Sequence, residues 1–291
     1  MADGLLLIGA TGQIGRNIVQ RTDDRLLLAL AREPKRVSAG PDVRPVQFDA
    51  TESLVEAGEG WPTDAISTLP IWRLAGVFEN LAMGCLNRLV CFSTTSIYGK
   101  SDTHNAHERA VVQRVQTAEG RVRALAEDHG VGLTILRPTL IYGEGTDRTI
   151  SAAARFVRRF GFYPVYGAAE GLRQPVHAAD LADAAVSALD SPDTVGHDYA
   201  LGGGETLPYR EMIARIFSTL EKANRTVRVP LLPPVLDIVG TVLPGSELTG
   251  DVARRMNADL DYDDGSAAAD FGYAPRRFLS GGKDDLFGNA T

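Results

Sequence analysis

The sequence predicts an α/β fold in which a doubly wound parallel sheet is joined to a smaller mixed lobe. In the first half of the chain, short apolar runs alternate with longer amphipathic stretches, which is the pattern of repeated βα units around a parallel sheet. After Arg137-Pro138 this alternation ends, and the last stretch, from Pro230 onward, is rich in Pro, Gly and Asp. The length of 291 residues is enough for one large core and a smaller second one.

Each element of the sheet region follows from its residue pattern. Short apolar runs predict six strands, over Leu5–Ile8, Arg25–Leu30, Val43–Phe48, Ala65–Leu69, Arg88–Phe92 and Gly132–Leu136. Apolar residues at helical spacing predict helices over Gln13–Arg21, Ile71–Gly84 and Glu108–Asp128. Gly130 marks the end of the last helix, because glycine adopts the left-handed conformation that commonly closes a helix.

The second half has less regular spacing. Helical patterns cover Arg148–Phe160, Ala178–Leu189 and Pro208–Ala223, and extended patterns cover Tyr163–Tyr166 and Leu172–His177. Thr206 is the predicted N-cap of the helix that begins at Pro208. We therefore predict a sheet domain formed by residues 1–145 and 172–201, a smaller lobe formed by 146–171 and 202–291, and a ligand cleft between them.

Composition and charge argue against several classes of protein. The net charge of −7 disfavours nucleic acid as a partner. No apolar run is long enough to span a membrane, and the first strand begins at Leu5, so we expect no membrane partner and no signal peptide. Cys85 and Cys91 are expected to be buried thiols in a protein of the reducing cytoplasm. His104 and His107 lack the helical spacing of metal ligands, so we expect no metal.

The segment that bears most on function is the turn after the first strand, Gly9-Ala10-Thr11-Gly12-Gln13-Ile14-Gly15. Glycine tolerates positive φ and lets a ligand approach the bare backbone, and the free N–H groups at the start of the next helix favour a pyrophosphate. Such a turn after the first strand of an α/β sheet is typical of Rossmann-type, dinucleotide-binding domains. The predicted cofactor residues in the turn are Gly9, Thr11, Gly12, Gln13, Ile14 and Gly15.

The end of the second strand distinguishes the two nicotinamide dinucleotides. Proteins that bind NAD usually place an acid there to bind the ribose 2′-hydroxyl. This chain has Arg32 instead, whose guanidinium suits a 2′-phosphate. The prediction is therefore NADP, with NAD left open because an arginine in a surface loop is the alternative interpretation.

Further strand ends meet the same edge of the sheet. The carboxylate of Asp49, after the third strand, either accepts a hydrogen bond from the adenine amino group or caps the helix that follows. The end of the fourth strand is expected to place its backbone near the cofactor riboses. The predicted cofactor residues at these strand ends are Asp49, Ala50, Ser67, Thr68, Leu69 and Pro138.

With these features in place, the chain resembles the extended short-chain dehydrogenase/reductase family of NAD(P)-dependent epimerases, dehydratases and reductases. The motifs that carry the resemblance are Gly9-Ala10-Thr11-Gly12-Gln13-Ile14-Gly15, Phe92-Ser93-Thr94-Thr95-Ser96-Ile97-Tyr98-Gly99, Leu136-Arg137-Pro138 with Ile141-Tyr142-Gly143, Arg173-Gln174-Pro175-Val176-His177 with Asp180-Leu181-Ala182, and Phe271-Gly272-Tyr273-Ala274-Pro275-Arg276. Their order and spacing run along nearly the whole chain, so the resemblance implies the family's fold. Function does not follow from fold alone.

The resemblance implies a Tyr-x-x-x-Lys pair on the helix before Arg137. In that pair the lysine lowers the pKa of the tyrosine, and the phenolate exchanges a proton with the substrate hydroxyl. At the matching positions this chain has Val111 and Val115. The predicted helix Glu108–Asp128 contains neither tyrosine nor lysine, so no shift of the alignment restores the pair. The chain thus resembles atypical members that keep the nucleotide site and lack the usual catalytic pair.

Three residues are candidates for the missing catalytic work. The resemblance assigns to Thr94 the hydroxyl that polarises the substrate oxygen. Tyr98 follows the fifth strand and Tyr142 follows the sixth, so each is a candidate proton donor at the expected cleft. The alternative for each tyrosine is a packed or hydrogen-bonded aromatic side chain. His177 is expected to fix the junction between sheet and lobe.

On the substrate side, Arg173 matches an arginine that contacts a phosphate in the nucleotide-sugar members of the family, and a solvated arginine is the alternative. Those members often carry an asparagine after the position of Arg137, where this chain has Pro138-Thr139, which argues against a nucleotide sugar. Helix Arg148–Phe160 also has a basic face, which either meets an anionic ligand or is simply solvated.

The sequence leaves two functions open. The first is an NAD(P)-binding reductase- or epimerase-like enzyme that acts on a hydroxyl or keto compound, possibly sugar-derived, through Thr94 with Tyr98 or Tyr142. The second is a protein that binds the dinucleotide without catalysis, as a redox sensor or an assembly partner. The loss of both Tyr and Lys favours the second function, whereas the intact glycine turn, the expected cleft and Arg173 favour the first, which is the leading hypothesis. The resemblance also implies a homodimer formed through the helix Glu108–Asp128.

Overall fold

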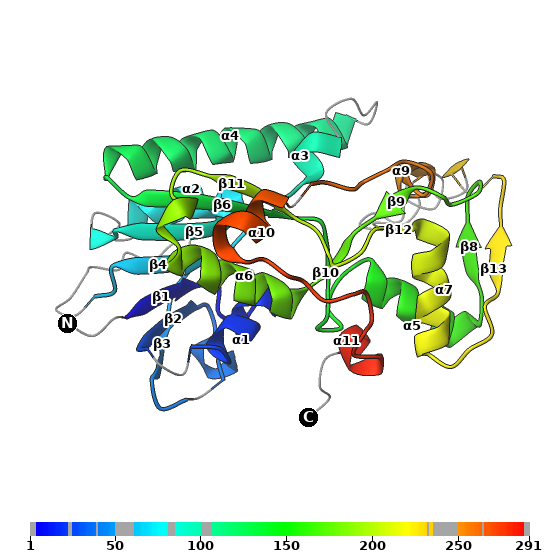
Figure 1. Cartoon of the computed structure of the whole chain (residues 1–291), viewed down its shortest axis with the longest axis horizontal. Coiled ribbons are helices and arrows are strands. Elements are labelled where there is room, and N and C mark those ends of the chain that lie inside the picture. Colours follow the sequence, from blue (N-terminus) through cyan, green and yellow to red (C-terminus); the bar gives the residue numbers. More distant parts are fainter. Residues whose placement is uncertain are drawn as a thin grey trace. The chain divides into compact units, whose positions relative to one another are not determined.

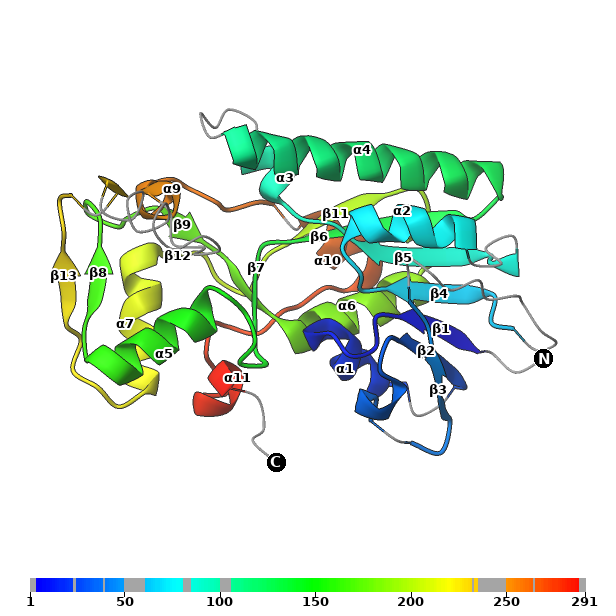
Figure 2. The ribbon, with the colours of Figure 1, turned by 180° about the vertical axis from the view of Figure 1, so that it is seen from behind.

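The computed structural model describes residues 4–22, 25–38, 40–49, 61–80, 85–99, 106–231, 233–234, 250–263 and 265–287. Its contacts divide the chain into two compact units. The first unit comprises Met1–Pro138, Ala178–Leu201 and Asp263–Ala274, and the second comprises Thr139–His177, Gly202–Tyr262 and Pro275–Thr291. Figures 1 and 2 show the elements of each unit.

A seven-stranded parallel sheet forms the centre of the first unit (Figure 1). Its strands are β1 (Leu5–Ile8), β2 (Leu27–Ala31), β3 (Val43–Gln47), β4 (Asp64–Ser67), β5 (Arg88–Phe92), β6 (Gly132–Pro138) and β11 (Asp198–Leu201). They lie in the order β11-β6-β5-β4-β1-β2-β3, which reverses direction at β1 and confirms the doubly wound class. The pattern search missed β11, because only two of its four residues are buried and so short a run does not stand out.

Helices cover both faces of this sheet (Figure 2). They are α1 (Gln13–Val19), α2 (Ile71–Asn80), α3 (Ser96–Gly99), α4 (Ala106–Asp128), α6 (Ala178–Asp190) and α10 (Gly265–Phe271). α2 packs against α4 on one face, and α1 packs against α6 on the other. The apolar sides of α2 and α4 share a core cluster with the sheet, in which Leu6, Leu89 and Val122 are fully buried. Removal of this apolar surface from water is the main driving force for the layered arrangement.

The second unit is the smaller mixed lobe. Its strands are β7 (Leu140–Tyr142), β8 (Tyr163–Val165), β9 (Leu172–Arg173), β10 (Pro175–His177), β12 (Leu207–Pro208) and β13 (Thr226–Arg228). Its helices are α5 (Ile150–Phe160), α7 (Tyr209–Thr219), α9 (Gly250–Arg255) and α11 (Lys283–Phe287). The strands form three separate pairs, β10 with β7, β12 with β9, and β13 with β8. A core of its own, which includes Ile213 and Phe217, packs between α5 and α7.

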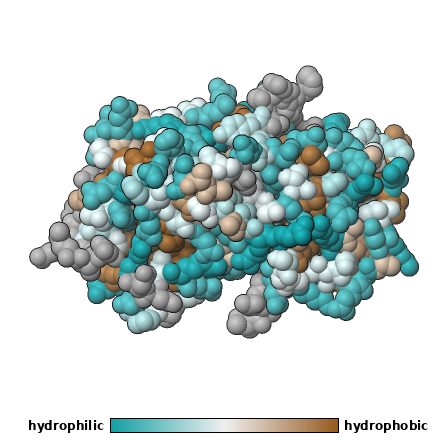
Figure 3. Space-filling model, viewed as in Figure 1, coloured by the Kyte–Doolittle hydropathy of each residue, from teal (hydrophilic) through white to brown (hydrophobic). Residues whose placement is uncertain are grey.

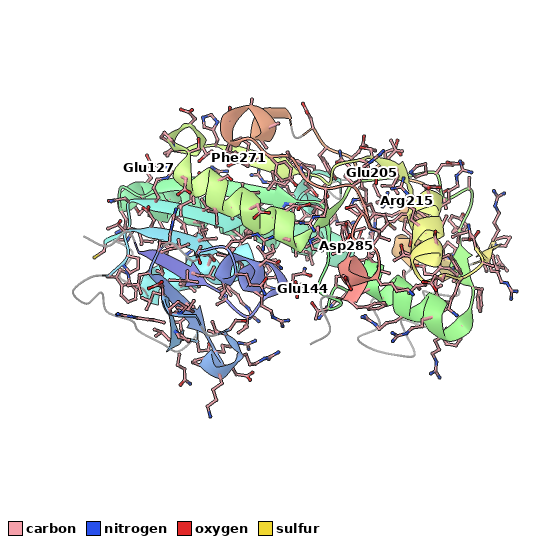
Figure 4. The ribbon with its side chains drawn as sticks, turned by 60° about the horizontal axis from the view of Figure 1, so that its bottom comes forward. Glu127, Glu144, Glu205, Arg215, Phe271 and Asp285 are labelled. Carbon is pink, nitrogen blue, oxygen red and sulfur yellow. The ribbon has the colours of Figure 1, made fainter. Side chains whose placement is uncertain are left out.

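The carboxylate of Glu205 ties the end of the chain to α7. Glu205 accepts hydrogen bonds from Arg215 and from the backbone N–H of Phe278, the latter at 2.9 Å (Figure 4). Burial would raise the pKa of Glu205, but these donors outweigh it and the pKa is lowered. The segment around Phe278 is therefore held against α7 by a charged contact in addition to apolar packing.

The segment Leu172–His177, predicted as one strand, is two strands in the structure. It divides at Gln174, whose side-chain oxygen accepts a hydrogen bond from the N–H of Tyr262 at 2.8 Å. The two halves then pair with different partners, β9 with β12 and β10 with β7. Because β7 and β10 pair with each other, residues 139–145 and 172–177 fall in the second unit rather than in the sheet domain. Residues 263–274 fall in the first unit, because α10 packs on β11 and α6.

Two local expectations from the sequence are wrong. α7 begins at Tyr209 with Pro208 as its N-cap, because Leu207–Pro208 is used as strand β12 and Thr206 lies outside the helix start. Cys85 is exposed while Cys91 is buried, because Leu86 rather than its neighbour Cys85 enters the core. Within the described residues, no helix combines the length and apolar composition needed to cross a membrane.

A buried ion pair joins α4 to β6. The Arg137 guanidinium donates to both carboxylate oxygens of Glu119, from Nε at 3.0 Å and from Nη2 at 2.6 Å. The two side chains are only 7% and 9% exposed. Arg137 Nη2 also lies 2.7 Å from Asp198 of β11, which Arg123 contacts as well. Burial opposes the charge on Arg137, but the hydrogen bonds with Glu119 outweigh this effect and its pKa is raised.

We expect the Glu119→Gln variant to unfold with a free energy about 3 kcal/mol smaller than that of the parent, because a buried guanidinium then faces a neutral amide. Asp198 still compensates part of the charge of Arg137, so the loss of unfolding free energy is expected at the low end of the range for broken buried ion pairs. Denaturant unfolding followed by circular dichroism measures it. The matched control is Asp183→Asn, which removes the more exposed Arg21–Asp183 pair and is expected to cost about 1 kcal/mol or less. Equal losses in both variants would contradict a special role for the buried pair.

Candidate functional site

A hollow of about 460 Å³ opens at the carboxyl ends of β1 to β4 in the first unit. Its lining comes from the segments that follow four neighbouring strands, which is where doubly wound sheets bind their ligands. Seven of the predicted cofactor residues line it, namely Gly9, Thr11, Gly12, Arg32, Asp49, Thr68 and Leu69. The structure therefore brings together, in one hollow, residues that lie up to sixty positions apart in the sequence.

The glycine turn has the conformation and the close contacts that require glycine. Gly9 has a φ of +95°, which residues with a side chain rarely adopt. A Cβ atom on Gly15 would lie 2.3 Å from the carbonyl oxygen of Gly9, a contact that no side chain tolerates. Thr68 donates from its hydroxyl to that same carbonyl at 2.9 Å, so the end of β4 holds the turn. α1 starts at Gln13, directly after Gly12.

Arg32 and Asp49 both line the hollow but differ in their exposure and in their contacts. Arg32 is exposed, and among the described residues it makes no ion pair or side-chain hydrogen bond. A guanidinium held at a pocket without a carboxylate partner is available to an anionic ligand. Asp49 is half-buried and makes an interaction of its own. Ala50 lies outside the described residues, as does the helix that Asp49 was expected to cap.

Two buried polar atoms beside the hollow have no hydrogen-bond partner among the described residues. They are Oε1 of Gln13 and Oγ of Ser67, each in a predicted cofactor residue next in sequence to a lining residue. Unpaired buried polar atoms are uncommon, because each costs free energy that a partner would recover. Polar groups of a ligand bound at this edge of the sheet fit such atoms.

Six residues that line the hollow were not among the predicted cofactor residues, namely Ile8, Leu30, Ala31, Phe48, Pro70 and Arg73. Of the six, Phe48 and Arg73 have the largest side chains. Phe48 is the last residue of the predicted third strand. Its position directly before Asp49, a predicted cofactor residue, could have identified it as part of the hollow. Arg73 lies in the first turn of α2, which begins three residues after β4 ends. Any charged side chain so close to the end of a central strand was a candidate for the same sheet edge. The hollow thus holds two arginines, Arg32 and Arg73.

Thr94 and Tyr98 follow β5 in the same unit. The Thr94 hydroxyl accepts a hydrogen bond from the backbone N–H of Ser96 at 3.1 Å, so its oxygen is held by a local turn. Tyr98 is 47% exposed, and its phenol oxygen accepts a hydrogen bond from Arg137 Nη1 at 2.7 Å. The guanidinium also lies over the Tyr98 ring, 5.5 Å from its centroid. Tyr98 is therefore an accessible phenol fixed by a permanent cation.

Val111 and Val115, which the family resemblance led us to match to the catalytic pair, lie on α4. Val115 is 1% exposed and belongs to the core cluster, and Val111 is half-buried. Side chains this deep in apolar surroundings serve packing. One turn beyond Val115, Glu119 forms the buried ion pair with Arg137. α4 therefore combines apolar packing on the sheet with charged contacts, from Glu119 to Arg137 and from Arg123 to Asp198.

Tyr142 and Arg173 belong to the second unit, so the hollow and Tyr98 are formed without them. Tyr142 is fully buried, and its hydroxyl accepts a hydrogen bond from the N–H of Leu279 at 3.1 Å. Its ring packs edge-on against His177 and Phe278, with centroids 5.1 Å apart in both cases. Tyr142 is therefore a packed and hydrogen-bonded aromatic side chain, which was the alternative to a role as proton donor.

Arg173 is 6% exposed and is bound to the backbone of its own unit. It donates hydrogen bonds to the carbonyls of Leu172, Ala258 and Arg255, at 2.6, 2.8 and 2.5 Å. Burial lowers the pKa of this guanidinium. By donating to the carbonyls of Arg255 and Ala258, Arg173 holds the turn after α9, so its side chain has a structural role.

The histidines complete the account of the predicted residues. His177 Nε2 lies 3.6 Å from the carboxylate of Asp285, which also accepts a hydrogen bond from the N–H of Gly281 (Figure 4). His104 lies outside the described residues, and the side chain of His107 is likewise not described. The described residues contain no group of three His, Cys, Asp or Glu side chains placed to hold a metal ion.

Sequence comparison finds relatives of two kinds. Over 156 residues the chain is 27% identical to NADH dehydrogenase (ubiquinone) 1 alpha subcomplex subunit 9, mitochondrial, of Arabidopsis thaliana, covering 53% of this chain and 34% of that protein. Over 183 residues it is 24% identical to UDP-glucose 4-epimerase of Vibrio cholerae, covering 63% of this chain and 54% of that protein. The chain thus spans about a third and about half of the length of these curated relatives.

Structural comparison extends over nearly the whole chain. UDP-glucuronic acid 4-epimerase from Bacillus cereus, solved with UDP-glucuronic acid and NAD, superimposes with a TM-score of 0.70 at 14% identity, covering 98% of both chains. UDP-glucose 4-epimerase from Thermotoga maritima, solved with UDP-glucose, gives a TM-score of 0.69 at 12% identity, covering 98% of this chain and 96% of that one. At these identities the likeness shows the fold.

The family assignment rests on a family model as well as on these relatives. The model of the NAD dependent epimerase/dehydratase family matches residues 52–202, just over half of the chain. That range contains β4 to β6, α4 and Tyr98, and the glycine turn precedes it. The chain belongs to the NAD-dependent epimerase/dehydratase family.

Proposed function

We propose that this chain binds NADP(H) in the hollow at the carboxyl ends of β1 to β4. The observation that carries the proposal is the glycine turn at Gly9 to Gly15, open to the hollow, with the guanidinium of Arg32 at the next strand end, which pairs with no carboxylate of the described residues. The bare backbone suits a pyrophosphate, and a guanidinium in place of the usual acid suits a 2′-phosphate. The second arginine of the hollow, Arg73, adds to its preference for an anionic ligand.

The proposed activity is reduction or epimerisation of a hydroxyl or keto compound. The dinucleotide, when bound, supplies or accepts the hydride. In this proposal Thr94 donates a hydrogen bond to the substrate oxygen, and Tyr98 exchanges the proton. Arg137 holds this phenol in place, because its guanidinium donates to the phenol oxygen at 2.7 Å and carries a permanent positive charge.

The proposed substrate is not a nucleotide sugar, although the named epimerases act on UDP-sugars. The arginine expected to meet a phosphate, Arg173, is occupied by three backbone carbonyls in this chain. The position after Arg137 holds Pro138, which has no side-chain donor. A smaller hydroxyl or keto compound without a diphosphate needs neither a phosphate contact from Arg173 nor a side-chain donor at position 138.

A second candidate function, dinucleotide binding without catalysis, rests on a different observation. Val115 is part of the apolar core, so the face of α4 that bears the catalytic pair in the usual family members is given over to packing. A protein of this kind would respond to the redox state of the dinucleotide or serve as a subunit of an assembly. The two candidates share the binding site and differ in the role of Tyr98.

The Arg32→Ala variant is expected to bind NADPH about 10- to 100-fold more weakly than the parent, because it loses charged hydrogen bonds to the 2′-phosphate. Its affinity for NADH, which has no such phosphate, should stay within about twofold. Isothermal titration calorimetry of both nucleotides measures the difference. The matched control is Arg36→Ala, an exposed arginine that pairs with Glu33 and does not line the hollow. Equal weakening of NADH and NADPH by Arg32→Ala would contradict the proposal of NADP.

The Tyr98→Phe variant separates the two candidate functions. With a carbonyl compound that the parent reduces, its turnover is expected to fall roughly 100- to 10,000-fold, since the proton donor is gone. Its affinity for NADPH is expected to match that of the parent, because Tyr98 does not line the hollow. Stopped-flow absorbance at the nicotinamide band gives the turnover. Unchanged turnover would exclude Tyr98 as the acid, and a parent that binds NADPH but oxidises it with no compound of a broad carbonyl panel would favour the second candidate.

A further inference from the structure

A basic and apolar surface lies on the second unit, where the end of α5 meets the strand pair of β8 and β13. We call it the Arg–Phe surface. Its residues are Arg159, Phe160, Phe162, Arg225, Val227 and Arg228. The two segments that form it, residues 155–166 and 222–231, contain five arginines and one lysine and no acidic residue. In a chain whose net charge is −7, this is a marked local reversal of sign.

Strand pairing brings the two segments side by side. β8 and β13 run parallel, with Val227 opposite Pro164, and the N–H of Tyr163 donates to the carbonyl of Arg225 at 3.1 Å. Tyr163 turns inward, where its hydroxyl contacts that of Tyr209 at 3.0 Å. Phe162, the residue before β8, keeps part of its side chain exposed.

The aromatic side chains of α5 continue the surface. The ring of Phe156 lies 4.6 Å from that of Phe160 and 5.6 Å from that of Phe162, centroid to centroid. Phe160 is 54% exposed and Phe162 is 37% exposed. Exposed phenylalanines in mutual contact form a continuous apolar patch rather than isolated surface residues.

Apolar exposure is concentrated in these two segments. Four of the six large hydrophobic side chains that are exposed among the described residues are Phe160, Phe162, Val227 and Leu231. Figure 3 shows brown residues at the right-hand edge of the molecule, where β8 and β13 lie, with teal residues around them. A patch of this kind on an otherwise polar surface marks an interaction site.

The arginines of the surface are not used inside the protein. Arg159, Arg225 and Arg228 are exposed, and among the described residues none of the three makes an ion pair. Arg159 lies over the Phe160 ring, 5.5 Å from its centroid, so cation and apolar ring are presented together. The adjacent acid, Glu221, is neutralised by Lys283 at 2.7 Å. The surface therefore offers positive charge and apolar side chains to one partner.

We propose that the Arg–Phe surface docks the protein onto a membrane of anionic phospholipids. The phosphates of such a membrane attract the arginines, and its acyl boundary accepts the three exposed apolar side chains of the surface, together with the nearby Leu231, without needing a matching pocket. Nucleic acid would use the arginines but gain nothing from Val227 and Leu231, which have no ring on which a base could stack. The expectation of no membrane partner rested on the lack of a spanning run, which attachment to a surface does not require.

Co-sedimentation with lipid vesicles tests the proposal. The full chain is mixed with vesicles of phosphatidylcholine alone and of phosphatidylcholine with phosphatidylglycerol, at low and at physiological salt. Binding is expected only with phosphatidylglycerol, and it is expected to weaken with salt because the charged part of the attraction is screened. The folded parent protein failing to bind phosphatidylglycerol vesicles at either salt concentration would overturn the proposal.

Two variants of the surface and one control identify the residues responsible. Arg225→Glu with Arg228→Glu is expected to lower vesicle partitioning at least about 25-fold, or roughly fivefold for each arginine removed. Phe160→Ser with Phe162→Ser should leave weak binding at low salt and abolish it at physiological salt. Lys35→Glu with Arg44→Glu makes the same change of net charge on exposed residues of the first unit and is expected to bind like the parent. Circular dichroism confirms that each variant is folded.

The remaining outcomes also decide the question. Binding that survives in both surface variants, or that is lost equally in the Lys35/Arg44 control, would overturn the proposal. A single-stranded oligonucleotide serves as the competing probe. Tight binding of this probe that depends on Arg225 and Arg228, without vesicle binding, would assign the surface to nucleic acid instead. Because none of these residues lines the hollow, the result stands apart from the NADP(H) titrations.

Discussion

The guanidinium of Arg137 is the group on which the site in the first unit depends. It lies at the end of β6 and bonds Glu119 on α4, Asp198 on β11 and the phenol of Tyr98 after β5. A planar group with five N–H donors can hold three partners at once, and it stays charged at any pH that a protein tolerates. Removal of two carboxylates and a cation from water is costly, so the cluster is stable only when its members remain together. The position of Tyr98 is thereby tied to the packing of α4 on the sheet.

This arrangement bears on the catalytic pair that the family resemblance led us to expect on α4. The helix contains neither tyrosine nor lysine, and Val115, at one of the two matched positions, lies deep in the core. The structure places a different phenol beside a permanent cation, because Tyr98 on the short helix α3 accepts a hydrogen bond from Arg137 at the end of β6. Whether the pair performs catalysis depends on where the nicotinamide ring lies.

Much of the fold was predictable from the sequence, because most of the parallel strands are short apolar runs and Gly9, Gly12 and Gly15 leave little choice of turn. The position of the hollow was also predictable, because the carboxyl ends of neighbouring parallel strands meet at one edge of the sheet. Arg73 and Phe48 each lie close to the end of a strand, which was the available signal, but only the sheet order brings them to the turn. Tyr142 and Arg173 show the opposite limit. Their motifs matched the family, but their burial and hydrogen bonds depend on a second unit whose short strand pairs leave almost no periodic signal.

A crystal structure of the protein with NADPH tests the central claim most directly, because it locates the nicotinamide relative to Tyr98. The account predicts the adenosine end between Arg32 and the glycine turn, and the phenol oxygen of Tyr98 within about 4 Å of the nicotinamide C4 or of a substrate oxygen bound beside it. The hydrogen bond from Arg137 to Tyr98 should persist in that complex. A nicotinamide that meets only apolar side chains, with Tyr98 turned away, would contradict the account and leave a dinucleotide-binding protein without a proton donor.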